Sequence, residues 1–212
     1  MGKDCCDQID QGALNVARYR RVLWMVLAIN AAMFVTEIGA GLVAKSASLQ
    51  ADALDFLGDS ASYAISLFVA GMALRYRAMA ALLKGASMAL FGVWVLGVTA
   101  WHLVNNSMPV AETMGVVGAL ALAANTACFM LLWQFRAGDS NMRSVWICTR
   151  NDMLGNIAVL LAAVGVFGTG AGWPDAVVAT IMALLALQGS WTTVRLARAE
   201  LHTDHGHAHH AH

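Results

Sequence analysis

The sequence has few charged residues and few prolines. Only 12% of its 212 residues are Asp, Glu, Lys or Arg, and only two are proline. Soluble domains contain about 25% charged residues, so this composition excludes an ordinary soluble fold. Apolar residues make up 59% of the chain and the mean hydropathy is +0.62, which indicates a protein embedded in a lipid bilayer.

The sequence has no excess of positive or of negative charge. The 13 Lys and Arg residues equal the 13 Asp and Glu residues in number, which argues against a nucleic-acid partner. The four cysteines are divided between a polar N-terminal segment and apolar stretches, so they predict no disulfide framework. The sequence also lacks the glycine-rich Lys-Ser/Thr loop that binds nucleotide phosphates, so any transport would use an ion gradient.

Six apolar segments follow a polar segment, residues 1–20, that lacks the basic start and early apolar core of a signal peptide. They lie near 21–43, 48–73, 79–103, 112–134, 143–167 and 173–194. A helix of about 20 apolar residues crosses a bilayer. The predicted fold is therefore an all-α, multi-pass membrane protein: a bundle of six transmembrane helices over residues 21–200, followed by a tail at 201–212.

Basic residues predict how this bundle is oriented. Lys45 is the one basic residue in the loops on one side, whereas many basic residues share the other side. By the positive-inside rule, the N- and C-termini are cytoplasmic. Lys84 and Arg150 lie near the cytoplasmic ends of their helices, where long side chains are expected to reach the aqueous surface. The basic residues on the cytoplasmic side are Lys3, Arg18, Arg20, Arg21, Arg75, Arg77, Arg136, Arg143, Arg195 and Arg198.

Three acidic residues interrupt the second apolar segment. Asp52, Asp55 and Asp59 lie at i, i+3 and i+7, which places them on one face of a helix. A carboxylate inside a membrane costs on the order of 3 kcal/mol, so this face is expected to turn away from lipid. A network of structural hydrogen bonds is one explanation for such a stripe, and an ion-binding site is the other.

The fifth segment carries a similar stripe. Cys148, Asp152 and Asn156 lie at i, i+4 and i+8 within the run CTRNDMLGN. The sequence DMLGNIA at 152–158 is identical in four of seven positions to DFLGDSA at 55–61, about half the chain away. This similarity predicts an inverted repeat of three helices, in which the second and fifth helices run antiparallel.

Carboxylates, an amide and a thiol on two facing helices suit a divalent metal ion with about four ligands. Carboxylates and thiols bind metal when deprotonated, so metal and protons displace each other, which is the basis of metal/proton exchange. A count of about 1.5 Å per residue from the helix ends places Asp59 opposite Asp152. The same count places Asp55 opposite Asn156. In the alternative register, shifted by about one turn, Asp55 faces Asp152. Asp59 then faces Cys148, whose thiolate would favour zinc or cadmium.

Further candidate residues flank this site. Glu37, in the outer half of the first segment, would carry protons or form a hydrogen bond with a neighbour. Asp52, towards the outer mouth, would attract cations or favour the start of its helix. Cys148 would act as a soft metal ligand or as a small packing residue. The adjacent Cys5 and Cys6 are a second candidate for soft metals, on the cytoplasmic face.

Six of the seven histidines lie in the C-terminal run LHTDHGHAHHAH at 201–212. Histidine-rich segments bind transition metals, and the predicted orientation places this one in the cytoplasm, where an exporter would collect its substrate. The alternative is a passive soluble tail. The candidate accessory ligands in this tail are His202, His205, His207, His209, His210 and His212.

The second and fifth segments resemble those of the cation diffusion facilitators, a family of six-helix divalent-metal/proton antiporters. The run SASLQADALDFLGD at 46–59 is similar to the family's second-helix signature, in which an Asp or His and an Asp four residues later bind the metal. Asp55 and Asp59 match both positions. In the fifth helix the family has His or Asp four residues before an Asp. Asp152 matches the first of these positions, whereas Asn156 replaces the second acid.

The resemblance implies a function. It implies a secondary transporter, not an enzyme, that exports Zn²⁺, or Cd²⁺ or Co²⁺, from the cytoplasm in exchange for protons, with no prosthetic group. It also implies a homodimer in the bacterial inner membrane, from a short branch without the family's C-terminal cytoplasmic domain. Asn125 and the run Trp173-Pro-Asp175 at the start of the sixth segment are further positions at which the sequence is similar to the family. The metal ligands implied by the resemblance are Asp55, Asp59, Asp152 and Asn156.

Two other functions fit parts of the pattern. Two aspartates on different helices could share a proton as in an intramembrane aspartyl protease, and LGD at 57–59 resembles part of the motif of such enzymes. The first glycine of that motif and its Pro-Ala-Leu partner are missing from the sequence. The other alternative is a membrane protein that binds metal without transporting it.

Overall fold

The computed structural model describes residues 4–69, 74–135 and 140–208, with side chains for 17–68, 75–76, 78–135, 152–199 and 201. A π-helical turn, η1 (Ile65–Val69), continues the second helix, and a 3-10 turn, η2 (Trp133–Phe135), continues the fourth. Where they are described, all six apolar segments are helical, and the first and last helices extend into the polar ends of the chain. The six α-helices in the described residues are α1 (Asp4–Ala44), α2 (Ala47–Ala64), α3 (Leu74–Val104), α4 (Ala111–Leu132), α5 (Ser140–Thr169) and α6 (Trp173–Ala208).

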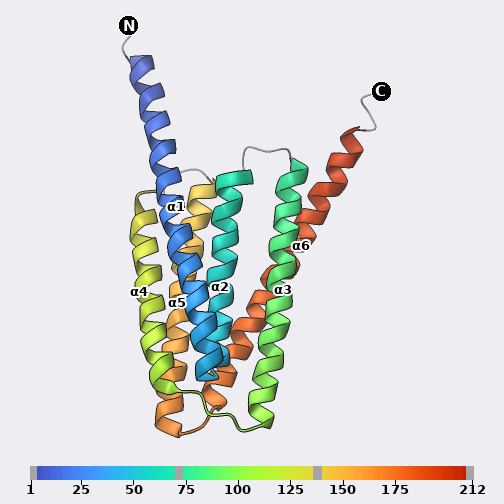
Figure 1. Ribbon diagram of the computed structural model, residues 1–212. Coiled ribbons are helices and arrows are strands. Elements are labelled where there is room, and N and C mark those ends of the chain that lie inside the picture. Colours follow the sequence, from blue (N-terminus) through green and yellow to red (C-terminus); the bar gives the residue numbers. More distant parts are fainter. Residues whose placement is uncertain (1–3, 70–73, 136–139, 209–212) are drawn as a thin grey trace.

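The helices run alternately in opposite directions, so the α1–α2, α3–α4 and α5–α6 connections lie at one end of the bundle (Figure 1). Each connection contains a residue in the left-handed region: Lys45 (φ 53°), Asn106 (φ 48°) and Gly170 (φ 61°). A left-handed residue ends a helix by turning the chain away from the helix axis. The start of α1 and the end of α6 lie at the opposite end of the bundle.

Five helical segments among the described residues are long and apolar enough to cross a membrane. α2 is not one of them, because three aspartates within its 18 residues lower its hydropathy. The expected all-α membrane bundle is therefore confirmed, with α2 as a polar helix within it. The five apolar segments are Ala17–Ala44, Ala78–Val104, Ala111–Phe135, Asp152–Thr169 and Trp173–Ala199.

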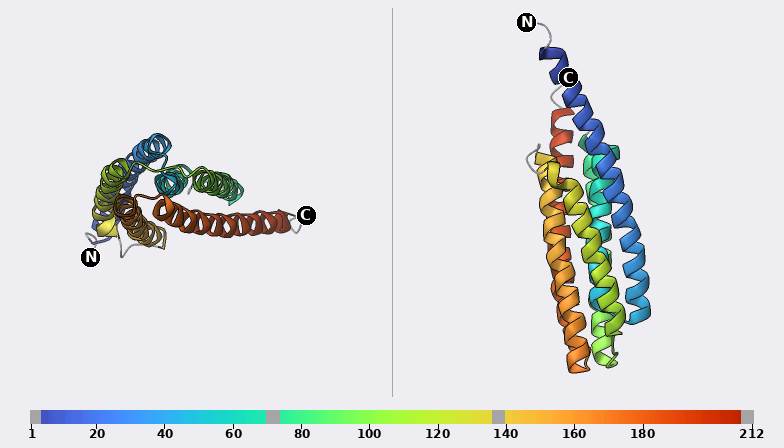
Figure 2. Two further views of the ribbon diagram at one scale, coloured as in Figure 1. Left: turned by 90° about the horizontal axis from the view of Figure 1, so that it is seen from below. Right: turned by 90° about the vertical axis from the view of Figure 1, so that its left-hand side faces the viewer.

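The polar helix α2 lies in the middle of the bundle. Viewed along the helices, α1, α4 and α5 group on one side of α2, whereas α3 and α6 form a pair on the other side (Figure 2). α2 contacts α1, α3, α5 and α6, and α4 packs on α1 and α5. The other helices thereby shield much of α2 from lipid, as its acidic stripe requires.

Apolar side chains pack in three clusters that follow one another along α2. The first cluster, nearest the α1–α2, α3–α4 and α5–α6 connections, includes Leu49 and Met114. A small middle cluster includes Phe56, and the third cluster includes Tyr63 and Leu132. Asp55 and Asp59 lie between the first and third clusters along α2, whereas Asp52 lies at the level of the first cluster, between Ala51 and Leu54.

Candidate functional site

A carboxylate from α6 fixes the start of α2. Ser46 is the N-cap, and its hydroxyl accepts a hydrogen bond from the Leu49 N–H at 3.2 Å. Asp175 Oδ1 accepts from Ser46 Oγ at 2.7 Å, from Ser48 Oγ at 2.6 Å and from Ser48 N at 3.1 Å. Its Oδ2 accepts from Ala47 N at 2.8 Å. A carboxylate is favourable at a helix N-terminus, so Asp175 stabilises the start of the helix that carries the three aspartates.

Burial changes along α2. All residues from 46 to 54 are buried, and Asp52 is only 1% exposed. Asp55 and Asp59 are partly exposed, as are most residues from there to η1. The end of α2 near the turns is therefore sealed, whereas the end near η1 is more open.

Asp59 on α2 and Asp152 on α5 form a carboxyl pair between the two helices. Their side chains are in hydrogen-bond contact with each other. The Tyr63 hydroxyl also donates to Asp59 Oδ2 at 2.7 Å. Asp152 Oδ2 is buried and has no hydrogen-bond partner among the described residues. Two carboxylates cannot hydrogen-bond each other without a proton between them, so this pair requires a proton or another cation.

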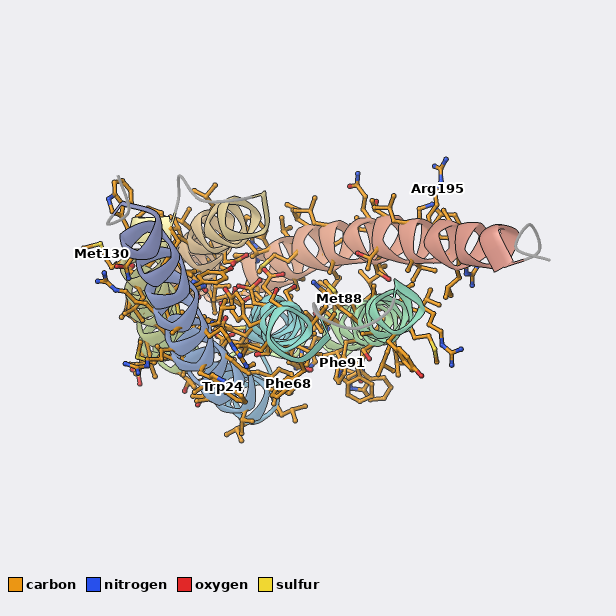
Figure 3. All side chains as sticks on the ribbon, turned by 90° about the horizontal axis from the view of Figure 1, so that it is seen from above. Trp24, Phe68, Met88, Phe91, Met130 and Arg195 are labelled. Atoms are coloured by element: carbon orange, nitrogen blue, oxygen red, sulfur yellow. The ribbon has the colours of Figure 1, made fainter. Side chains whose placement is uncertain are left out.

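Lys84 on α3 turns towards the same region. Its ammonium group donates a hydrogen bond to Ser62, and its charge is near enough to act on Asp59. The cleft between α2 and α3 has a volume of about 330 Å³, and Lys84 is the one charged residue among those that line it. Met88 also lies between α2 and α3, against Gly58 (Figure 3).

The expectation that Lys84 reaches the aqueous surface stays a prediction, because its side chain is partly exposed while it donates to Ser62. A hydroxyl one helix away, on the acidic face of α2, provides a hydrogen-bond acceptor inside the bundle. The side chain of Arg150, for which the same behaviour was expected, lies outside the described residues.

A second pair of carboxyl groups lies nearer the sealed end. Glu37 on α1 is fully buried, and its carboxyl group contacts that of Asp52. Neither oxygen of Glu37 has a hydrogen-bond donor within the described part of the chain. Asp55 lies close enough to act on both Glu37 and Asp152, so it stands between the two carboxyl pairs.

Two asparagines complete this second group. The Asn156 amide fits its surroundings with the nitrogen towards Asp52, donating to Oδ1 at 3.1 Å and to Oδ2 at 2.5 Å. In this orientation the Asn156 oxygen accepts from Asn125 Nδ2 at 2.7 Å. Asn125 and Asn156 are 2% and 0% exposed, so both amides are enclosed by the bundle.

The two expected registers can be compared with these contacts. The Asp59–Asp152 contact agrees with the register that places these residues opposite each other. Asn156 does not face Asp55, as that register expects, but bonds to Asp52. Asp55 lies beside Gly155 instead, with its Oδ2 3.5 Å from where a Cβ would be. The alternative register pairs Asp59 with Cys148, whose side chain lies outside the described residues.

No group of three His, Cys, Asp or Glu side chains within the described residues converges as metal ligands would. The acids instead form pairs linked by Asp55. The helix α6 continues to Ala208, but the candidate histidines of the tail and the pair Cys5 and Cys6 have no described side chains. Their metal-binding roles stay predictions.

The sequence analysis did not predict the contacts that three residues make at or near the site. Tyr63 extends the acidic stripe of α2 by one further turn, and this spacing was the signal that could have identified it. Lys84 and Asp175 act across helices, through Ser62 and through the start of α2. Sequence spacing contains no signal for either contact.

Comparison with known proteins identifies similar chains. The cation efflux transmembrane domain matches residues 23–202. The metal cation efflux system protein CzcD of Cupriavidus metallidurans is 26% identical over 187 residues, covering 82% of this chain and 59% of that protein. The zinc transporter ZitB of Yersinia pestis is 26% identical over 196 residues, covering 84% and 62%.

The cadmium, cobalt and zinc/H(+)-K(+) antiporter of Bacillus subtilis is 25% identical over 197 residues, which cover 84% of this chain and 62% of that protein. The chain therefore spans about three fifths of the length of these curated relatives.

Proposed function

The chain belongs to the cation efflux family, and on this basis we propose that it exports a divalent transition metal ion from the cytoplasm in exchange for protons. The names of its relatives support this class of cargo, since one is a zinc transporter and another a cadmium, cobalt and zinc antiporter. Zn²⁺ is the proposed main cargo, with Cd²⁺ and Co²⁺ as alternatives. The metal is transported and protons are the counter-ion, so the proposal includes no prosthetic group.

The contact between Asp59 and Asp152 carries this proposal. The pair requires one positive charge, which either a proton or a metal ion can supply. A metal ion that enters must displace the shared proton, and a proton that returns must displace the metal. The same two side chains therefore link the movement of metal to the movement of protons.

Asp55 is the proposed third ligand. It lies one turn from Asp59 on the same face of α2, and its charge acts on both Asp59 and Asp152. Because no three acids converge within the described residues, we expect a bound ion to draw Asp55 away from Gly155 and towards the pair. Asn156 was expected in this ligand set, but its contact with Asp52 suggests a separate role, argued below.

We propose six membrane spans, with α2 crossing inside a shell of apolar helices. The acids of α2 and its moderate length agree with a helix that is shielded from lipid. Five arginines are exposed in the first half of α1 and the second half of α6, towards the end of the bundle opposite the α1–α2, α3–α4 and α5–α6 connections. They are Arg18, Arg20, Arg21, Arg195 and Arg198. Their position supports a cytoplasmic location for that end.

The family also supports a membrane location and an oligomeric state. Bacterial relatives and five long apolar helices agree with a multi-pass protein of the bacterial inner membrane. A homodimer is proposed from the family resemblance alone. Family membership also favours transport over intramembrane proteolysis, although both would use a pair of aspartates.

Zn²⁺ flux into proteoliposomes under an imposed pH gradient tests the proposal. We expect flux to follow the size and direction of the gradient. The isosteric changes Asp59→Asn and Asp152→Asn should abolish it, because each removes one charge of the pair. Glu112→Gln, an exposed acid in the first turn of α4, is the matched control and should retain full flux. Wild-type protein that moves none of Zn²⁺, Cd²⁺ and Co²⁺ would exclude the proposed transport.

A further inference from the structure

A second cluster of polar side chains lies outside the Asp59–Asp152 pair. It consists of Glu37, Asp52, Asn125 and Asn156, which come from α1, α2, α4 and α5. Each of the four is at most 2% exposed. Four helices therefore converge on one enclosed polar group in an otherwise apolar part of the bundle.

The cluster contains two carboxyl groups and two amides, and none of its four residues is basic. Glu37 and Asp52 contact each other through their carboxyl groups, and neither Glu37 oxygen has a donor among the residues described. The side chains that act on Glu37 and Asp52 are each other and, for Glu37, Asp55. Enclosed carboxylates are stable only when their charge is compensated, so this cluster, like the Asp59–Asp152 pair, holds a proton or another cation.

The Asn156 amide has a favourable orientation both without and with a cation beside Asp52. With its nitrogen towards Asp52 it donates two hydrogen bonds, and it accepts one from Asn125. Rotation of the amide by half a turn would place the Asn156 oxygen at the same 3.1 and 2.5 Å from the two Asp52 oxygens. Oxygens that close repel one another unless a cation lies among them.

Asn125 is arranged to support both orientations. Its Nδ2 donates to the Asn156 oxygen, and its own Oδ1 is buried without a partner in the described structure. When both amides rotate, this free oxygen can accept from the Asn156 nitrogen, so the hydrogen bond between the two amides is kept. Rotation would therefore cost little at Asn125 while it turns the Asn156 oxygen towards the acids.

We propose that Glu37, Asp52 and Asn156 form a second position for a divalent cation, further out on the transport path than Asp59 and Asp152, and that saturating metal fills both positions. All of its donors are oxygen atoms, which suit divalent cations that accept carboxylate and amide ligands. Asn125 is a positioning residue that holds the Asn156 amide. The inference rests on the proposed function, because it adds a step to the same outward path.

Counting bound Zn²⁺ per chain tests this position. The full chain in lipid nanodiscs is brought to equilibrium with saturating Zn²⁺, and wild type is compared with Glu37→Gln, Asp59→Asn and the double variant. We expect each single variant to bind one ion fewer than wild type, and the double variant to bind two fewer. Any ions on the histidine tail contribute equally to all four proteins, and Glu112→Gln should bind as many ions as wild type.

A Glu37→Gln protein that binds as many ions as wild type would overturn the second position. If Glu37→Gln loses an ion while Asp59→Asn loses none, the second position stands and the proposed transport site at Asp59 fails. Should Glu37→Gln not fold, Asn156→Leu gives an independent test, because it leaves the acids in place. We expect it to weaken one of the two binding events by about tenfold or more and to leave the other unchanged. Two unchanged events would contradict the proposal.

Discussion

Tyr63 donates its hydroxyl hydrogen to Asp59 Oδ2 at 2.7 Å, from one turn further along the same helix. The tyrosine ring is buried in the third apolar cluster, which holds the hydroxyl in place. The bond orients the Asp59 carboxyl group towards α5, where Asp152 lies. The ligand orientation therefore depends on a side chain that does not itself bind the ion.

The change Tyr63→Phe removes this donor and keeps the packing of the ring. We expect the Zn²⁺ affinity of the Asp59–Asp152 site to fall by about tenfold, as for other residues that orient a metal ligand. Competition with a chelating dye measures this affinity. Tyr76→Phe, which changes an exposed tyrosine on α3, is the control. Equal affinities for Tyr63→Phe and wild type would show that Tyr63 does not orient the ligand.

Lys84 places a positive charge near Asp59 through its hydrogen bond to Ser62. A divalent ion at Asp59 is repelled by this charge, so Lys84→Met, which keeps the length of the side chain, should tighten Zn²⁺ binding. At alkaline pH, where proton competition is weak, we expect an increase in affinity of about three- to tenfold. Lys45→Met, in the exposed α1–α2 turn, should change nothing. Weaker binding in Lys84→Met would mean that Lys84 supports the ion instead of opposing it.

Asp175 connects the starts of α2 and α6 through four hydrogen bonds from residues 46–48. Asp175→Ala leaves these buried donors without an acceptor, and we expect it to lower the free energy of unfolding by about 3 kcal/mol. Thermal unfolding in detergent measures the loss, with Glu112→Gln as the control. A midpoint within experimental error of wild type would show that the contact does not stabilise the bundle.

Much of this arrangement could be predicted from the sequence. The six apolar segments are helical over their described residues, because their length and composition permit little else in a bilayer. The depth of Asp59 and Asp152 followed from a constant rise per residue counted from the helix ends, and the two side chains do meet. Regular helix geometry thus predicted the levels of these residues.

The contacts of Asn156 and Lys84 could not be predicted in the same way. A depth count gives the level of a residue but not the rotation of its helix, and Gly155 presents no side chain between α5 and the α2 acids. Asn156 therefore meets Asp52 instead of Asp55. For Lys84, the spacing along its own helix gives no information on a partner in another helix, and the hydrogen bond to Ser62 was therefore not predicted.

Proton release on metal binding tests the central claim most directly, because the Asp59–Asp152 pair is proposed to exchange its proton for the ion. Zn²⁺ is added to the full chain in a weakly buffered solution, and the released protons are counted for wild type and for the Asp59→Asn/Asp152→Asn double variant. Protons released by the histidine tail are common to both. We predict that wild type releases at least one more proton per chain than the double variant, and equal release by the two proteins would contradict the account.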